Sequence, residues 1–306
     1  MYTLPIRIGT RASKLALRQA EETRGGLIAI HGLGSDDVMI VPFTTTGDSI
    51  RDRPLADSGG KGLFTSVIER ALLDDKIDIA VHSLKDMPSA LPNGLTIAAV
   101  LARADPRDAF LSPLAPGLTD LPQGAAVGTA SIRRRAQIKR LRPDLEVVPF
   151  RGNVETRLRK LHDGQVDATI LACAGLMRLG LDHEITSHLD PEEMVPAIAQ
   201  GAIGLEIRNS DDALREALAP LNHTPSQRAI GAERAFLATL GGSCHTPIAG
   251  LARIDDDRLR FRGMVSSLDG QTALSVERCG PPHEAAAIGK AAGEEMIRRG
   301  AAKFLT

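Results

Sequence analysis

The chain has 306 residues, 43% of them apolar, which is enough for two or three domains with real cores. Its 37 basic residues balance 38 acidic ones and only 3% are aromatic, which argues against a nucleic-acid binder. The start of the sequence lacks a long apolar stretch, so we expect no signal peptide and no membrane span. Cys173, Cys244 and Cys279 are scattered without metal-ligand spacing, so we expect a cytoplasmic protein without a metal site.

The first stretch of the chain reads as alternating strands and helices. The predicted elements are strands at 4–8, 38–43 and 77–81 and helices at 13–23 and 63–73. Ser13 is suited to cap the first helix, and Gly25-Gly26 follow its expected end near Thr23. Residues 44–62 are polar and glycine-rich, which is typical of a mobile loop.

The second stretch repeats this plan, with strands predicted at 125–127, 147–150 and 168–172 and helices at 131–141 and 154–161. Ile8-Gly9-Thr10 corresponds to Val127-Gly128-Thr129, and Val41-Pro42-Phe43 corresponds to Val148-Pro149-Phe150. The segment 72–78 corresponds in the same way to 161–167, each leading into a strand. Three matched landmarks in one order predict two similar α/β lobes that meet at a ligand-binding cleft.

The remaining segments complete the first lobe and add a small domain. Residues 201–207 read as a strand that returns to lobe one. From about residue 221 the pattern changes to a helix at 225–240, strands at 247–254, 259–266 and 272–277, and a helix at 283–299. We therefore expect lobe one at 1–101 with 202–220, lobe two at 102–201, and a C-terminal α+β domain at 221–306.

A tight turn in the last domain presents a cysteine. Two glycines end the preceding helix, and Cys244 follows in the sequence Gly241 to Pro247. A thiol held on such a turn can reach into a cleft. The alternative is that Cys244 is a small buried apolar residue, as free cysteines commonly are.

Arginines gather at the starts of helices. Those placed at a strand end or helix start are Arg11, Arg133, Arg134, Arg151 and Arg157, with Arg178 after a strand. Converging guanidiniums would bind a ligand with several carboxylates or phosphates, whereas the alternative is a solvated helix face. We assign the solvated role to Arg135, Lys139, Arg140 and Arg142. On this view Arg134→Leu loses activity with little loss of stability.

An acid follows the strand at 77–81. Asp86 comes after Lys85 at the carboxyl end of that strand, where it can stabilise a positive intermediate and transfer a proton. The alternative is an ordinary turn aspartate before Met87-Pro88. His82 and His245 have no partner at metal-ligand spacing, and we assign both a structural role. Gly59 to Gly62 is only a weak phosphate-binding signal because it lacks the Walker spacing.

Five motifs together resemble one family. They are His82-Ser-Leu-Lys-Asp-Met-Pro88, Gly128-Thr-Ala-Ser-Ile-Arg-Arg134, Arg151-Gly-Asn153 with Thr156-Arg157, Ala174-Gly-Leu-Met-Arg-Leu-Gly180 and Gly242-Ser-Cys244. In this order, over nearly the whole chain, they resemble porphobilinogen deaminase, also called hydroxymethylbilane synthase.

The resemblance implies three domains, the first two similar to periplasmic binding proteins. It also implies a dipyrromethane cofactor attached by a thioether to Cys244. Four porphobilinogen units are added head to tail, each losing ammonia, and hydrolysis then releases hydroxymethylbilane. Each porphobilinogen carries an acetate and a propionate, so the growing chain is a polyanion that arginines can bind. Loss of ammonia leaves a cationic azafulvene, which the carboxylate of Asp86 can stabilise.

The resemblance also assigns residue roles. Asp86 and Lys85 are catalytic. The cofactor is held by Cys244, Ser83, Lys85, Asp86, Thr129, Ser131, Arg133 and Arg134. Substrate or chain carboxylates are bound by Arg11, Ser13, Gln19, Lys61, Arg151, Arg157 and Arg178. Asp57 and Thr46 replace basic residues found in relatives, which puts the cationic role of the loop at 44–62 in doubt.

Two other classes of protein remain to be separated from this enzyme. A polyanion-binding protein of two-lobed form would explain the arginines but leave Cys244 and Asp86 without a role, and it usually has a signal peptide. A nucleic-acid binder would use the helix of Arg133, against the neutral charge of the chain. We expect a monomer that takes porphobilinogen and binds neither nucleic acid nor membrane, and the intact mass separates the three classes.

Overall fold

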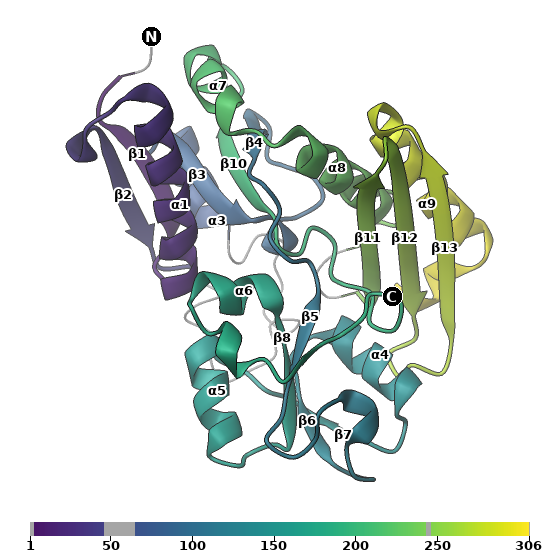
Figure 1. The fold of residues 1–306 in the computed structure, drawn as a ribbon. Coiled ribbons are helices and arrows are strands. Elements are labelled where there is room, and N and C mark those ends of the chain that lie inside the picture. The colour runs from purple at the N-terminus through teal and green to yellow at the C-terminus, as the bar shows by residue number, and fades with distance from the viewer. Residues whose placement is uncertain (1–2, 46–64, 243–245, 306) are drawn as a thin grey trace. The chain divides into compact units, whose positions relative to one another are not determined.

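The computed structural model describes residues 3–45, 65–242 and 246–305. The chain forms two compact units, one of residues 1–104 and 202–227, the other of residues 105–201 and 228–306 (Figure 1). The first unit contains lobe one. The second contains lobe two and the C-terminal helices and strands. The finer division at residues 101/102 and 220/221 stays a prediction.

Lobe one is built on a five-stranded sheet in the order β2-β1-β3-β10-β4. Its strands are β1 (Ile6–Arg11), β2 (Val38–Phe43), β3 (Ile79–Ser83), β4 (Leu95–Val100) and β10 (Ile203–Arg208). β1 pairs in parallel with β2 and β3, whereas β10 runs antiparallel to β3 and β4. The returning strand predicted at 201–207 is therefore confirmed as β10.

The helices of this unit are α1 (Lys14–His31), α3 (Ser66–Leu73) and α7 (Asp212–Leu218). Ser13 caps α1, as predicted, by accepting a hydrogen bond from the Ala16 amide. The expected end of α1 near Thr23 is wrong, because the helix runs through Gly25 and Gly26 and ends at the left-handed Gly32. Gly26 allows a close approach, since a Cβ there would lie 2.5 Å from Leu221 Cδ2.

Lobe two contains a second five-stranded sheet, in the order β7-β6-β8-β5-β9. Its strands are β5 (Asp108–Leu111), β6 (Ala126–Gly128), β7 (Glu146–Val148), β8 (Ala168–Ala172) and β9 (Ser187–His188). Its helices are α4 (Ile132–Leu141), α5 (Val154–His162) and α6 (Cys173–Arg178). β6 pairs in parallel with β7 and β8, and β5 runs antiparallel to β8.

The two sheets share one plan, which confirms the predicted duplication. In each, a parallel trio at one end of the sheet is followed by an antiparallel strand, which is β10 in lobe one and β5 in lobe two. The correspondence extends to single atoms. Asp78 Oδ2 accepts a hydrogen bond from the Arg7 amide at 2.8 Å, and Asp167 Oδ2 accepts one from the Ala126 amide at 2.7 Å. Each carboxylate ties the start of the third strand to the start of the first.

The sequence patterns missed β4, β5 and β9. β5 has only four residues and begins with a charged one, and β9 has only two residues. A short strand gives too few residues for alternation to stand out. Their place in the sheet is set instead by pairing with strands from other parts of the chain.

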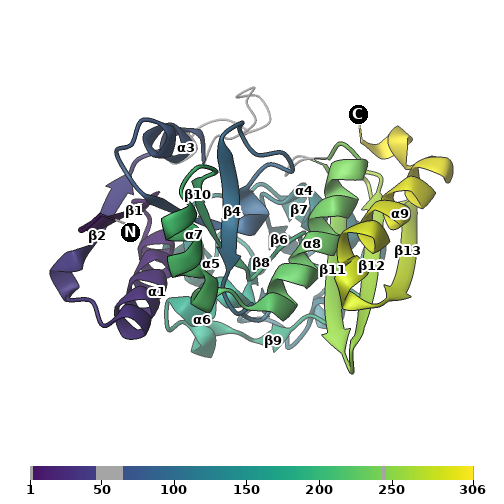
Figure 2. The same cartoon turned by 90° about the horizontal axis from the view of Figure 1, so that it is seen from above.

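The C-terminal part combines a three-stranded antiparallel sheet with two helices that pack against one another (Figure 2). The elements are α8 (Thr224–Thr239), β11 (Ile248–Asp255), β12 (Arg258–Ser266), β13 (Ala273–Gly280) and α9 (Ala285–Arg298). The Phe236 ring of α8 lies 5.0 Å from the Phe261 ring of β12. The predicted hairpin turn after β11 is confirmed by positive φ values at Asp256 and Asp257.

The described 3₁₀ turns are η1 (Ser35–Asp37), η3 (Leu84–Asp86), η4 (Leu118–Asp120), η5 (Asp182–Glu184), η6 (Ala219–Leu221), η7 (Pro282–Glu284) and η8 (Ala301–Phe304). Among them, η3 is the one that carries predicted catalytic residues.

In the described parts of the chain, no helix combines the length and the apolar character that crossing a membrane requires. The predicted fold class, two similar α/β lobes with a small C-terminal α+β domain, is thus confirmed.

Candidate functional site

The turn η3 directly follows β3 and presents Asp86 at the carboxyl end of the lobe-one sheet. Leu84 anchors this turn, because its side chain is buried and its amide donates to the Ala202 carbonyl at 3.0 Å. Gly204 on β10 makes room for it, since a Cβ there would lie 2.3 Å from Leu84 Cδ2. Close packing against β10 therefore fixes where Asp86 lies.

Asp86 faces Arg11, which lies at the end of the neighbouring strand β1. Arg11 Nη1 is 3.7 Å from Asp86 Oδ2, and the two side chains are 24% and 35% exposed. That separation makes an ion pair but is too long for a strong hydrogen bond. A carboxylate and a guanidinium thus stand together, both partly open to solvent, as a site for a charged ligand requires.

Gln19 and Ser83 form a polar contact beside this pair. Gln19 Nε2 on the buried side of α1 lies 2.7 Å from Ser83 Oγ at the end of β3. One small cavity is lined by Arg11, Ala16, Gln19, Thr65, Val81, His82, Ser83 and Asp86. The structure therefore brings together four of the predicted residues, each from a different element: Arg11, Gln19, Ser83 and Asp86. Lys85 is half-buried on the same turn, whereas the Ser13 hydroxyl caps α1 instead of lining the cavity.

In lobe two the corresponding strand end leads into α4. Ser131 caps this helix by accepting a hydrogen bond from the Arg134 amide, and Thr129 Oγ1 accepts one from the Ser131 amide at 3.1 Å. The free amides at the start of a helix attract anions. The start of α4 is thus capped by its own side chains, and the cofactor contacts assigned to Thr129 and Ser131 stay a prediction.

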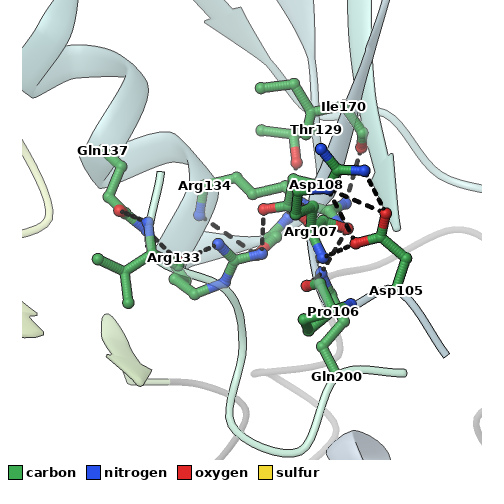
Figure 3. Close-up of polar contacts among 12 residues, drawn as sticks. Asp105, Pro106, Arg107, Asp108, Thr129, Arg133, Arg134, Gln137, Ile170 and Gln200 are labelled. Carbon is green, nitrogen blue, oxygen red and sulfur yellow. Dashed lines mark hydrogen bonds and ion pairs between the residues drawn. The ribbon is translucent and has the colours of Figure 1, made fainter. Parts of the chain in front are cut away.

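Arg133 and Arg134 extend from the first turn of α4 to Asp108 at the start of β5 (Figure 3). Arg133 Nη2 donates to Asp108 Oδ2 at 2.8 Å, and Arg134 Nη2 donates to Asp108 Oδ1 at 2.7 Å. Gln200 Nε2 donates to the same Oδ1 at 2.9 Å. Arg133 and Arg134 are only 5% and 6% exposed, so both guanidiniums have a protein partner that the sequence did not reveal.

Further bonds tie this cluster to the backbone of lobe two. Arg133 Nη1 donates to the Val195 carbonyl and Arg134 Nη1 to the Ile170 carbonyl, each at 2.7 Å. Gln137 exchanges hydrogen bonds with both backbone groups of Val195. The arginines therefore join α4, β8 and the segment after β9.

Asp108 is held as a carboxylate despite complete burial. Burial alone would raise its pKa, but the charges of Arg133 and Arg134 and the hydrogen bonds from Arg134 and Gln200 outweigh burial and lower the pKa well below its usual range. Burial lowers the pKa of Arg133, because it disfavours the charged form, whereas the charge of Asp108 raises that pKa. Arginine remains charged because its ordinary pKa is above 12. Two cations against one anion leave this cluster net positive.

The other predicted arginines of lobe two are only half-buried. Arg157 Nε donates to the Gly152 carbonyl at 2.8 Å, next to the Asn153 cap of α5. Arg178 donates to the Gly201 carbonyl at 3.3 Å. Arg151 is partly exposed just before the same helix start. All three side chains are partly open to solvent, Arg157 and Arg178 already bond to backbone carbonyls, and their assigned role in binding carboxylates stays a prediction.

The surface prediction for the outer face of α4 is confirmed in part. Arg135 and Arg140 are exposed, as predicted. Lys139 and Arg142 are half-buried instead, because each side chain donates to backbone carbonyls, Lys139 to that of Leu145 and Arg142 to that of Leu121.

Several predicted residues lie outside the described part of the chain. They are Lys61 and the loop positions Thr46 and Asp57, and Cys244 and His245 in the last domain. The assignments made to them stay predictions.

One group of metal-type ligands occurs among the described residues. Asp105, Cys173 and His188 bring ligand atoms within 4.8 Å of one another. Both Asp105 oxygens already accept hydrogen bonds from Arg107, and burial raises the pKa of Cys173 to about 12. A metal ion here would have to displace Arg107 from Asp105 and the proton from the Cys173 thiol.

The fold and these residues define a two-lobed α/β protein whose strand ends carry cations suited to an anionic ligand. A family model described as porphobilinogen deaminase, dipyromethane cofactor binding domain, matches residues 6–216. The model of the C-terminal domain of porphobilinogen deaminase matches residues 228–298. The chain therefore belongs to the porphobilinogen deaminase family.

The chain is also similar to individual proteins. The chain is 54% identical over 300 residues to a porphobilinogen deaminase of Paracoccus denitrificans, covering 98% of this chain and 96% of that protein. Among solved structures, a periplasmic substrate-binding protein of an ABC transporter from Coxiella burnetii has a TM-score of 0.45 and 16% identity, covering 75% of this chain and 96% of its own. The methionine-binding protein MetQ has a TM-score of 0.45 and 14% identity, covering 76% and 93%.

Proposed function

We propose that this chain condenses four porphobilinogen units head to tail on a dipyrromethane primer attached to Cys244, releasing ammonia at each addition and finally hydroxymethylbilane. Family membership makes the chain a deaminating transferase of tetrapyrrole synthesis with a dipyrromethane cofactor. The observation that carries the assignment of the reacting residues is the partly exposed Arg11–Asp86 pair at the end of the lobe-one sheet.

Asp86 is the residue we assign to the chemistry of the departing amine. Positive charge develops on the substrate as ammonia leaves, and a carboxylate held by the turn η3 can offset that charge. As the protonated acid, the same side chain can give a proton to the departing amine, and the carboxylate that results can take one from the pyrrole ring. Lys85 lies in the same turn, where it can bind a carboxylate of the ligand.

The described residues fit a cofactor with several carboxylates. Partly exposed guanidiniums stand at Arg11, Arg151, Arg157 and Arg178, and some of them already have protein partners, such as Asp86 for Arg11 and the Gly152 carbonyl for Arg157. The capped starts of α4 and α5 add backbone amides, and the Arg133–Asp108–Arg134 cluster leaves a net positive charge close to Thr129 and Ser131. When bound, the dipyrromethane supplies the pyrrole carbon on which the chain grows.

Gln19, Ser83 and Arg11 have a positioning task in this proposal. The short contact between Gln19 and Ser83 orients the serine hydroxyl at the cavity wall, and Arg11 provides the cation next to Asp86. Together they can hold a substrate carboxylate and keep the amine-bearing carbon near Asp86. Binding energy spent on orientation in this way contributes to the rate.

We further propose a cytoplasmic monomer. Cys173 and Cys279 are free thiols, which is usual in a reducing compartment. Sedimentation of the purified chain would test the oligomeric state.

The proposed reaction is tested with purified chain and porphobilinogen. We expect four ammonia molecules to be released for every molecule of hydroxymethylbilane. The hydroxymethylbilane is measured after it has been closed chemically to a porphyrin. Ammonia release without a linear tetrapyrrole, or consumption of porphobilinogen no faster than in buffer, would contradict the proposal.

A further inference from the structure

Beneath the Asp86 turn, lobe one buries a histidine and two glutamates. His82 Nε2 on β3 lies 3.0 Å from Glu206 Oε2 on β10, and their side chains are 3% and 0% exposed. The antiparallel register pairs His82 with Gly204, so Glu206 lies diagonally across the ladder on the same face. The absence of a side chain at Gly204 leaves space between the two groups.

Both glutamates have an oxygen without a hydrogen-bond partner among the described residues. These atoms are Glu206 Oε1 and Glu69 Oε1, each fully buried. Burial raises the pKa of the Glu69 carboxyl on α3, and the charges of both Glu206 and His82 act on it. A buried polar atom left unpaired is costly, so a cluster of this kind in a stable core calls for a function.

His82 connects this buried cluster to the proposed reaction site. It is one residue before Ser83 and four before Asp86, and it lines the same small cavity as both. The interior side of the imidazole is held by Glu206, and the cavity lies on the side of Arg11 and Asp86. His82 thus contacts a buried carboxyl group and also lines the cavity that contains the carboxylate assigned to proton transfer.

We propose that His82, oriented by Glu206, is a positioning residue for Asp86: the pair fixes the end of β3 and sets the electrostatic environment of the cavity in which Asp86 exchanges protons. This inference deepens the proposed function and rests on it. It assigns His82 a role beyond the structural one that the sequence indicates.

The charges around His82 come from four elements. Glu206 belongs to β10, Glu69 to α3 and Arg11 to β1, while η3 supplies Lys85 and Asp86. α1 contributes the neutral Gln19. An ionised Glu206 accepts a hydrogen bond from the Nε2–H tautomer, which leaves Nδ1 to respond to the cavity. Replacing that carboxylate by an amide removes a buried charge and the preference for one tautomer.

The decisive variant is Glu206→Gln, which preserves shape and changes charge. We expect the kcat for porphobilinogen consumption to fall at least tenfold with KM within twofold, because the arginines that bind carboxylates are untouched. We also expect the pH profile of kcat to change its shape, with intact mass showing normal cofactor loading. A pH profile that superimposes on that of the parent chain would overturn the inference.

Two controls separate positioning from general damage. His31→Gln removes a second imidazole of lobe one, which is only half-buried. Its Nε2 lies 2.8 Å from the Ala217 carbonyl, and it does not line the cavity. Glu21→Gln removes an exposed carboxylate of α1 that pairs with Arg24 and does not line the cavity. Both should leave the pH profile of kcat unchanged. An equal change in either variant would overturn the specific role of His82.

A measurement on the parent chain keeps the inference testable if Glu206→Gln fails to fold. Nitrogen-15 NMR of the histidines should show His82 as the Nε2–H tautomer with a slowly exchanging ring proton, and His31 exchanging faster. The opposite tautomer at His82, or exchange as fast as at His31, would overturn the inference. If the parent chain does not convert porphobilinogen, the proposed function fails, whereas this NMR result stands or falls by itself.

Discussion

The fully buried carboxylate of Asp108 lies 2.7 Å from Arg134 Nη2 and 2.8 Å from Arg133 Nη2, so one acid holds two neighbouring arginines of α4. These arginines belong to the motif that identifies the family, yet in the structure they are interior groups. Their charge still exceeds that of Asp108. The cluster can therefore stabilise lobe two and at the same time bias the start of α4 toward anions.

The first prediction concerns Asp108→Asn. The amide keeps the shape but leaves two buried guanidiniums without a counter-ion, and breaking a buried ion pair costs about 3–5 kcal/mol. We expect the free energy of unfolding in urea to fall by about that amount at pH 7. A loss below about 1 kcal/mol, the range of surface ion pairs, would show that the cluster is solvated.

The same variant has a consequence for acid stability. The pKa of Asp108 is lowered in the folded state, so its contribution is present above the unfolded pKa of about 4 and is lost as the pH falls below it. The parent chain should therefore lose stability between about pH 5 and 2 more steeply than Asp108→Asn. Urea unfolding at several pH values measures the difference, and parallel curves would contradict it.

The second prediction revises an expectation from the sequence. Arg134→Leu was expected to spare stability because Arg134 was interpreted as a cleft residue. The structure shows it buried on Asp108, so we now expect a loss of about 3–5 kcal/mol in addition to lost activity. Arg135→Leu is the matched control on the same helix, exposed and expected to change stability by less than about 0.5 kcal/mol. Equal effects of the two variants would contradict the burial of Arg134.

Much of the fold could be predicted because the same order of strands and helices occurs twice in the sequence, once for each lobe. The matched segments 72–78 and 161–167 form the same structure in both lobes, down to the acceptor roles of Asp78 and Asp167. The end of α1 could not be predicted from Gly25 and Gly26, because the glycine that terminates a helix is the one with a left-handed conformation. Only the structure shows that this residue is Gly32.

The sequence predicted those site residues that lie at the end of a strand. It did not predict the acids whose role depends on a buried partner far away in the sequence. Arg11, Ser83 and Asp86 follow strands, so their meeting was expected from topology. Asp108 begins a short apolar run and Glu206 lies inside one, and they find their partners 25 and 124 residues away. An acid within an apolar strand was the available signal, because buried charges require partners.

The third prediction tests Asp86. Asp86→Asn should keep the stability of the parent chain, because the side chain is partly exposed and its contact with Arg11 is long. An amide cannot offset the developing positive charge or transfer a proton, so we expect kcat to fall by about a factor of 10² to 10⁴. Hydroxymethylbilane formation at the parental rate would reject the assignment. Asp74→Asn, an exposed acid of the same lobe, serves as the control with no expected change.

The fourth prediction compares two glycines of lobe one. Gly204→Ala places a Cβ 2.3 Å from Leu84 Cδ2 and should displace the turn that carries Asp86, costing about 1–3 kcal/mol of stability together with activity. Gly25→Ala lies inside α1 with no atom near its Cβ, so it should stabilise the chain by about 0.5–1 kcal/mol and leave kcat unchanged. Thermal unfolding and kcat measure both. An active, fully stable Gly204→Ala would show that the turn is not positioned by β10.

The last prediction concerns the attachment of the cofactor. Chain purified from cells that make porphobilinogen should be heavier than its sequence by two linked pyrrole units, with the adduct on the peptide that contains Cys244. Cys173 is excluded as the nucleophile because burial raises the pKa of its thiol to about 12, which leaves almost no thiolate at neutral pH. Cys279 is exposed on β13, but exposure of a thiol is not by itself a reason for the cofactor to attach there.

Three variants decide between these thiols. Cys244→Ser should lack both the added mass and the activity, because a hydroxyl is a far weaker nucleophile than a thiolate near neutral pH. Cys279→Ala and Cys173→Ala should retain the adduct, and the latter should also lose some stability, since Cys173 is fully buried in lobe two. The Cys244→Ser chain should be more sensitive to protease, because a bound polyanion stabilises the folded state that it binds. An unmodified mass with full activity in the parent chain would reject a covalent cofactor, and an adduct on Cys279 would move the attachment point to β13.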